Sequence, residues 1–272
     1  MIITDTHTHS IHSFDGKPEA TVDAMCQNAI SLGIKYLCIT DHYEANYRTQ
    51  YPDYPVYNAA LARRDVFEAK EKYKDKLTVI YGIECGQITQ ATDTALEFLN
   101  ENGFEFVLGS LHNTSGEEDP YILDMSKFNQ EQLRHRWDTY LSELSLVADF
   151  DCFESMAHLT YPIRYCFRDS NPFDISYSKD AIAKILQKII KKEMCLEVNS
   201  SGFRQKMGSP DPCGVVLELY RELGGELITI GSDGHHLEHM AFAYDLTEKY
   251  LKDLGYKHYH LKTKNDILTF DL

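Results

Sequence analysis

The sequence is poor in basic residues. Its 272 residues include 27 Lys and Arg against 42 Asp and Glu, which gives a formal net charge of −15. A protein that binds nucleic acid broadly needs a basic face for the phosphates, and docking on an anionic membrane surface needs one too. The composition therefore argues against both functions. It does not exclude a small anionic substrate, because bound metal ions reverse the sign of the charge locally.

The sequence also lacks paired cysteines and long apolar runs. None of its seven cysteines forms a C-x-x-C pair, and four of them lie in or beside apolar runs: Cys38, Cys85, Cys152 and Cys195. We predict that these are buried, reduced thiols. No apolar run is long enough to span a bilayer, and the first residues lack the basic and apolar regions of a signal peptide. We therefore expect a cytoplasmic protein.

Short apolar runs alternate with longer amphipathic stretches along the chain. The runs predicted as strands are Ile2–Thr4, Tyr36–Thr40, Thr78–Glu84, Phe106–Ser110, Cys152–Ala157, Met194–Asn199 and Leu227–Gly231. The helical patterns cover residues 19–32, 57–74, 92–102, 129–149, 179–191, 212–223 and 238–254. This alternation predicts an α/β fold with a parallel sheet, formed as a single domain over residues 1–272. Two stretches, Asn46–Tyr57 and Glu117–Phe128, are predicted to be long loops.

Nearly every predicted strand is followed at once by a His, Asp or Glu. In chain order these residues are Asp5, His7, His9, Asp41, His42, Glu84, His112, His158, Asp233 and His235. The carboxyl ends of parallel strands meet at one face, where α/β enzymes carry their active sites. Taken singly, each residue has an ordinary interpretation as polar surface or as a hydrogen-bonded structural side chain. Six strand ends together predict a metal site, because imidazole and carboxylate are ligands that divalent metals accept.

This series resembles the PHP superfamily, the polymerase and histidinol phosphatase domains. The motif D-x-H-x-H-S followed by S-x-D-G matches Asp5–Ser10 and Ser13–Gly16, and the later motifs match Thr40–His42, Gly82–Glu84, Ser110–His112 and Gly231–His235. The resemblance covers residues 3 to about 235. It implies a distorted (β/α)7 TIM-like barrel with the active site at the C-terminal ends of the strands.

The resemblance also implies three divalent metal ions, of Zn, Mn or Fe. The first would be bound by His7, His9, Glu84 and Asp233, and Glu84 would bridge to a second ion bound by His112 and His158. The third would be bound by Asp15, His42 and His235. His12 competes with Asp15, because both follow the H-x-H turn, and the motif position favours Asp15. Asp5 and Asp41 are expected to orient the ligating imidazoles by contacting them on the side away from the metal ions. His236 and His239 are expected at the surface, on the start of the last helix.

One segment points to a branch of the superfamily. Met156–Tyr165 resembles the G-H-L-D-Y-x-x-R-Y segment of PHP-type histidinol-phosphate phosphatases, and Leu196–Asn199 resembles their L-E-I-N strand end. Thr160 stands where that branch often has Asp, and the arginine expected after Asn199 is displaced to Arg204. We expect Arg164 to clamp phosphate through its guanidinium fork, with Arg204 as a second, weaker candidate.

The function that the resemblance implies is hydrolysis of a small phosphate monoester, L-histidinol phosphate, in histidine biosynthesis. Glu84, Asp233 and Arg164 would carry the reaction, in which a metal-bridged hydroxide attacks phosphorus. Three alternatives stay open: a PHP phosphoesterase that acts on nucleotides or short nucleic acids, a protein-tyrosine phosphatase, and a PHP domain whose site is structural. Neither nucleic acid nor a membrane is an expected partner.

Overall fold

Seven parallel strands form the centre of the molecule. The computed structural model describes residues 1–47 and 56–272, so the predicted loop Asn46–Tyr57 falls largely outside the described residues. The strands are β1 (Thr4–Asp5), β2 (Tyr36–Ile39), β4 (Thr78–Gly86), β5 (Phe106–Ser110), β6 (Ser155–Met156), β7 (Cys195–Asn199) and β8 (Ile228–Gly231), in that spatial order. A further short strand, β3 (His42–Glu44), pairs in parallel with the upper part of β4.

The sheet closes between its first and last strands. The Thr6 amide, just after β1, donates to the carbonyl of Ile230 in β8 at 3.1 Å, and the Asp233 amide, just after β8, donates to the His7 carbonyl at 2.8 Å. The His9 amide then donates to the Gly234 carbonyl at 3.0 Å. This seam makes a nearly closed barrel, which confirms the predicted fold class. It also brings the first and the last predicted metal ligands together.

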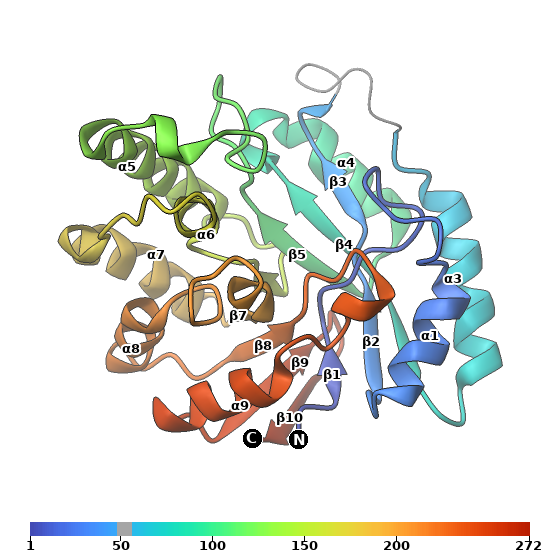
Figure 1. The fold of residues 1–272 in the computed structure, drawn as a ribbon. Coiled ribbons are helices and arrows are strands. Elements are labelled where there is room, and N and C mark those ends of the chain that lie inside the picture. Colours follow the sequence, from blue (N-terminus) through green and yellow to red (C-terminus); the bar gives the residue numbers. More distant parts are fainter. Residues whose placement is uncertain (48–55) are drawn as a thin grey trace.

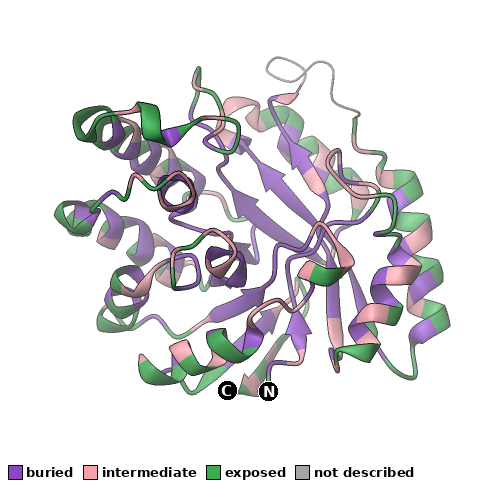
Figure 2. Cartoon of the chain, viewed as in Figure 1, coloured by how far each residue is buried: buried purple, intermediate pink, exposed green. Residues whose placement is uncertain are grey.

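Helices cover the outer face of the barrel (Figure 1). They are α1 (Val22–Ser31), α3 (Ala59–Tyr73), α4 (Thr92–Asn102), α5 (Gln130–Val147), α6 (Tyr161–Arg168), α7 (Lys179–Lys191), α8 (Gly214–Glu222) and α9 (Tyr244–Asp253). Their inward faces are buried and their outward faces are exposed, as Figure 2 shows. In α7 the buried residues Ile182, Ile185, Leu186 and Ile189 follow the helical period, so one apolar stripe packs on the sheet. Within the described residues, no helix has the length and hydropathy of a membrane span.

Two helices differ from the sequence prediction. The predicted last helix, 238–254, begins only at Tyr244, because a 3-10 helix at Leu237–His239 and a turn come first. Helix α6 was not predicted, since its eight residues are shorter than the stretch of 10 to 12 residues, roughly, on which a helix is assigned from sequence. The predicted loop Glu117–Phe128 is confirmed, with only one turn of 3-10 helix at Met125–Lys127.

A hairpin covers the end of the barrel opposite the ligand-bearing strand ends. It consists of β9 (His258–Lys262) and β10 (Ile267–Asp271), paired antiparallel, and the sequence analysis missed it. Leu261, Leu268 and Phe270 pack against the residues that fill this end of the barrel: Cys38, Ile80, Phe106, Leu108 and Ala157. Along β4, Ile80 and Glu84 share the inward face, because side chains alternate along a strand. The barrel interior is therefore apolar at one end and ionisable at the other.

The cysteines are free thiols. Cys38, Cys85 and Cys195 are fully buried, and burial raises the pKa of each thiol. The prediction of buried, reduced thiols is confirmed for these three. It is wrong for Cys152, which is partly exposed because it lies in the bend that precedes β6.

Candidate metal centre

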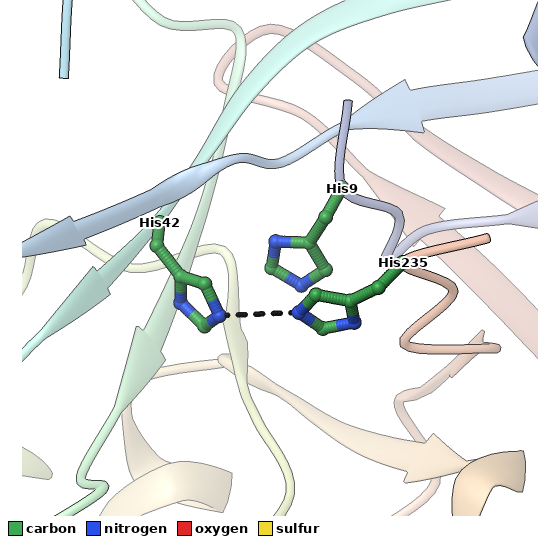
Figure 3. Close-up of side chains that lie close together, drawn as sticks. All are labelled: His9, His42 and His235. Carbon is green, nitrogen blue, oxygen red and sulfur yellow. Dashed lines mark hydrogen bonds between the residues drawn. The ribbon is translucent and has the colours of Figure 1, made fainter. Parts of the chain in front are cut away.

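Four overlapping clusters of imidazole and carboxylate groups lie at the carboxyl ends of the strands. In each cluster the candidate ligand atoms lie within 4.8 Å of one another. The clusters are His9, His42 and His235; His7, His9 and Asp233; His7, Glu84 and His158; and His42, Glu84 and His112. Figure 3 shows the first of them, with three rings from distant parts of the chain that converge on one point. The structure thus brings together eight of the nine residues predicted as ligands.

Glu84 lies at the middle of this group and is fully buried. Its Oε1 atom lies 2.8 Å from His158 Nε2 and 3.0 Å from His112 Nε2. Its Oε2 atom lies 3.2 Å from His7 Nε2 and 2.9 Å from His42 Nδ1. Each carboxylate oxygen therefore faces a different pair of imidazoles, which is the geometry that a carboxylate bridging two metal ions requires.

Asp15 is the ninth predicted ligand, and the structure places it at the edge of the same group. Its Oδ2 atom lies 2.8 Å from His235 Nε2 and 3.8 Å from His42 Nε2. His12, its competitor, turns away and pairs with Asp65 on α3, with 2.9 Å between His12 Nε2 and Asp65 Oδ2. The geometry therefore favours Asp15 over His12 as the candidate ligand beside His235.

Two buried glutamates that the sequence analysis did not single out contact the predicted ligands from behind. Glu197 Oε1 lies 2.7 Å from His7 Nδ1, and Glu44 Oε1 lies 2.8 Å from His112 Nδ1. A carboxylate on the far nitrogen of a ligating imidazole fixes the orientation of the ring and raises its basicity. A signal for Glu44 was present in the sequence, since it follows His42 by two positions and so shares its face of a strand.

Two glycines make room for these glutamates. A Cβ atom on Gly86 would overlap the carboxylate of Glu44, and one on Gly231 would lie 2.6 Å from Glu197 Oε1 and against the Cβ atom of His7. Neither position tolerates a side chain while the glutamate stays in place. Gly86, two positions after Glu84, and the first glycine of the G-S-D-G-H motif are thus explained by close approach.

The predicted role of Asp5 and Asp41 is wrong in its detail. Asp41 accepts hydrogen bonds from the backbone amide and the hydroxyl of Ser10, at 2.6 and 2.9 Å. Asp5 does the same for Ser232, at 2.9 and 2.7 Å. Both aspartates therefore hold the backbone of the loops that carry the imidazoles, and Glu44 and Glu197 contact the rings themselves.

The electrostatics of the centre couple the acids to the imidazoles. Burial would raise the pKa of Glu84, but the imidazoles of His42, His7 and His112 outweigh burial and hold that pKa well below its ordinary range. Burial would lower the pKa of His112, but Glu44 and Glu84 raise it to about 10. The carboxylates thus favour the protonated form of these imidazoles. A metal ion that binds here must therefore displace a proton from the ring nitrogen.

The ring nitrogens of the centre provide a test of whether it fits metal ions. His7 Nε2 and His9 Nε2 are buried and make no hydrogen bond to any residue that the structure describes. His7 Nε2 lies 3.2 Å from Glu84 Oε2 but is not oriented for a hydrogen bond, and His9 Nε2 lies 3.6 Å from the same oxygen, beyond hydrogen-bond distance. Buried polar atoms are rarely left unpaired, and a metal ion between them would satisfy both nitrogens. The residues present fit divalent metal ions.

A cavity of about 470 Å³ opens above the centre, and both predicted phosphate-binding arginines line it. Arg164 is buried, and its Nη1 atom donates to Ser201 Oγ at 2.8 Å and to Asp233 Oδ2 at 3.0 Å. Arg204 donates through Nη1 and Nη2 to the carbonyl oxygens of Ser232 and Asp233, at 2.9 and 2.8 Å. Arg164 thus lines the cavity next to a predicted ligand, while Arg204 holds the loop that carries that ligand.

His236 and His239 are partly exposed, in agreement with their predicted place at the surface, but they do not lie on the last helix. His236 and His239 line the rim of the cavity and are partly buried. They lie in and beside the 3-10 helix that precedes α9, not on α9 itself. The ring of His236 contacts Glu19, with 3.1 Å between Nδ1 and Oε1.

Comparisons with known proteins identify a family and several relatives that this chain resembles. The model of the PHP domain family matches residues 5–201. A probable histidinol-phosphatase of Thermotoga maritima is 31% identical over 93% of each chain, and a probable phosphatase of Aliivibrio fischeri is 24% identical over 92% of this chain and 86% of its own. Among solved structures, the histidinol phosphate phosphatase of Lactococcus lactis in complex with zinc, L-histidinol and phosphate has a TM-score of 0.75 and 21% identity. That match covers 97% of this chain and 98% of the other.

Proposed function

The chain belongs to the PHP domain family, and from this premise we propose that residues 1–272 form one domain that hydrolyses L-histidinol phosphate to L-histidinol and phosphate, a reaction of histidine biosynthesis. The observation that carries the phosphatase part is the buried group of imidazoles and carboxylates beneath a cavity lined by Arg164. The similarity to the Thermotoga maritima protein along nearly the whole chain supports the choice of ester.

The proposed ligands of three divalent metal ions are His7, His9, Asp15, His42, Glu84, His112, His158, Asp233 and His235. Three such ions bring six positive charges, and the three carboxylates of this set return three negative charges. The centre would then carry a charge of about +3, which attracts a phosphate dianion even in an acidic protein. When bound, the ions would lower the pKa of water and stabilise negative charge on phosphoryl oxygens.

Arg164 is the residue proposed to hold the phosphate. Its Nη1 atom is committed to Ser201 and Asp233, but its buried Nε atom makes no hydrogen bond within the described part of the chain. Because Arg164 lines the cavity next to Asp233, its guanidinium can bind a phosphate oxygen there. Its stacking on the ring of Tyr161, with 4.4 Å from Cζ to the ring centroid, fixes its plane.

Glu84 and Asp233 are proposed to act by fixing the positions of the ions relative to the phosphorus atom. Both are buried, and surrounding imidazoles lower the pKa of each carboxyl despite burial. They therefore stay ionised at neutral pH. Arg204 is proposed to act on the reaction through Asp233, whose backbone carbonyl it binds.

The test is phosphate release from L-histidinol phosphate, nucleoside monophosphates and phosphotyrosine by the metal-loaded protein. We expect the highest kcat/KM for histidinol phosphate, and a loss of activity toward all three esters in Glu84→Gln. A preference for nucleotides or phosphotyrosine by orders of magnitude would contradict the proposed substrate. Fewer than two metal ions per chain, together with a fully active His112→Ala, would contradict the proposed centre.

A further inference from the structure

Asp211 is a fully buried carboxylate that has no role in the proposed chemistry at phosphorus. It lies in the segment after β7, outside the proposed ligand set. Its backbone pairs in both directions with Asn199, the last residue of β7. The Asp211 amide donates to the Asn199 carbonyl at 2.9 Å, and the Asn199 amide donates to the Asp211 carbonyl at 2.7 Å. A buried carboxylate is costly unless it has partners, so its surroundings indicate what it does.

One oxygen of Asp211 holds the turn that carries His158. Asp211 Oδ1 accepts from the Thr160 amide at 3.0 Å and from the Thr160 hydroxyl at 2.7 Å. Thr160 follows His158 by two positions and directly precedes α6, the helix that carries Arg164. His158 has a φ of +48°, in the left-handed region, which costs energy for a residue other than glycine. The carboxylate of Asp211 therefore fixes a strained turn between a proposed metal ligand and the proposed phosphate-binding arginine.

The other oxygen of Asp211, Oδ2, is buried and has no hydrogen-bond partner among the described residues. Within the same part of the chain, His158 Nδ1 and Arg164 Nε are also buried and unpaired. His158 Nε2 lies 2.8 Å from Glu84 Oε1 and so faces the proposed centre. A metal ion bound at Nε2 leaves the proton of the neutral ring on Nδ1, which makes Nδ1 a donor. A buried donor of this kind requires an acceptor.

Arg164 and His158 both act on the carboxyl group of Asp211. Burial raises the pKa of Asp211, and these two side chains oppose burial and lower it. The effect is mutual, because attraction between opposite charges stabilises both charged forms. Burial would lower the pKa of Arg164, but nearby groups that include Asp233 and Asp211 hold it well above its ordinary value. Asp233 is a proposed metal ligand, so Asp211 is the carboxylate of the two that stays available to the guanidinium.

The packing of the chain makes room for Asp211 at this place. A Cβ atom on Gly202, in the 3-10 helix after β7, would lie 2.4 Å from the Ser209 carbonyl oxygen and 3.0 Å from the Asp211 backbone nitrogen. Only glycine therefore lets the segment that carries Asp211 approach so closely. Thr160 is also the position at which the sequence departs from the segment that it resembles, where Asp is common. The structure brings a carboxylate to this turn from 51 positions away.

We propose that Asp211 is a positioning residue for the metal centre and for Arg164: its carboxylate fixes the His158 turn through Oδ1, and its Oδ2 is the acceptor for the Nδ1–H group of His158 and neutralises the buried guanidinium. This inference rests on the proposed function. Asp211 would then do for His158 what Glu197 does for His7, because a carboxylate behind a ligating imidazole orients the ring and raises its basicity.

The test uses Asp211→Asn, which keeps the size of the side chain and an acceptor for Thr160 but removes the charge. We expect this variant to release metal at a chelator concentration about 10-fold lower than the wild type does. With metal in excess, KM for phenyl phosphate and for L-histidinol phosphate should both rise about 10-fold, because a charged hydrogen bond that supports Arg164 is lost. The value of kcat should change less than about threefold, since the lost interaction is made before and during the reaction alike.

A second variant separates positioning from a general loss of structure. Thr160→Asp combined with Asp211→Asn places the carboxylate on the other side of the same hydrogen bond, and it should restore metal retention and KM to within about threefold of the wild type. The matched control is Ser209→Ala, which removes a hydroxyl from the same buried segment, where it donates to the Pro210 carbonyl at 3.1 Å. This control should leave both measurements unchanged.

Unchanged metal release and KM in Asp211→Asn, or no recovery in the double variant, would overturn the inference. If Asp211→Asn does not fold, Thr160→Val provides the test, because it removes the hydroxyl that Asp211 Oδ1 accepts from and should release metal about threefold earlier. An unchanged release curve for that variant would also overturn the inference. If the wild type cleaves phenyl phosphate but ignores histidinol phosphate, the proposed substrate is wrong, and KM for phenyl phosphate in Asp211→Asn still decides the inference.

Discussion

Glu44→Gln should weaken metal binding without disturbing the barrel. Burial would raise the pKa of Glu44, but the imidazole of His112 outweighs burial and lowers it to about 2, so the side chain is ionised at neutral pH. The contact with His112 Nδ1 is 2.8 Å long and only 6% of Glu44 is exposed, so solvent screens it little. Glutamine keeps the size of the side chain but removes the charge that makes the imidazole a strong ligand.

Loss of such a carboxylate typically lowers metal affinity by about 10- to 100-fold, which corresponds to about 1.4–2.8 kcal/mol. The assay is a titration of the metal-loaded protein with a chelator, with metal per chain measured by mass spectrometry. Asp271→Asn is the control, because it removes a carboxylate–imidazole contact of 3.0 Å to His258 in the hairpin at the other end of the barrel. If Glu44→Gln and Asp271→Asn release metal at the same chelator concentration, the reasoning is refuted.

Three further predictions follow from single contacts. Gly86→Ala should weaken metal binding in the same titration, because its Cβ atom would displace the carboxylate of Glu44. Burial raises the pKa of Glu154 from 4.5 to about 6, so the folded chain holds this proton more tightly than the unfolded chain and stability falls as pH rises between these values. Glu154→Gln should therefore gain about 2 kcal/mol in unfolding free energy over the wild type at pH 8, and not at pH 4, in urea denaturation. His12→Ala should retain the metal content of the wild type, whereas Asp15→Asn should lose metal from the position beside His235.

Each of these predictions has an outcome that contradicts it. An unchanged chelator titration for Gly86→Ala would show that Glu44 can move without cost. An equal gain for Glu154→Gln at both pH values would mean that its ionisation is not the cause. A larger metal loss in His12→Ala than in Asp15→Asn would reverse the choice between these two residues.

The position of the centre was predictable from sequence because it depends on strand ends. Buried apolar runs locate parallel strands well, and a ligand directly after such a run can only lie at the carboxyl face. Phe106–Ser110 was predicted with its observed bounds, and His112 follows it in the cluster with Glu84. Asp15 was ranked above His12 by motif position, and the structure places Asp15 beside His235 and His12 beside Asp65.

The residues behind the ligands were harder to predict, because their roles depend on contacts between distant segments. Glu197 is separated from His7 by 190 positions, and nothing local in the sequence pairs the two. Gln87 has a left-handed backbone conformation, which a glutamine in the sequence does not predict. The hairpin, in contrast, did leave a signal. Tyr259 and Leu261 alternate with polar residues, as expected for an antiparallel strand with one buried face.

The seam between β1 and β8 has a consequence for how the protein is made. It joins Thr6 to Ile230, which are 224 positions apart, and the same junction brings Asp233 to His7. A ribosome releases the N-terminal ligands early and the last ones only when most of the chain has been synthesised. Until then His7 lacks its support from Glu197 and the barrel stays open. Metal loading of the proposed centre would therefore be a step of the full-length chain, and ions captured by a nascent chain would be held by an incomplete set of ligands.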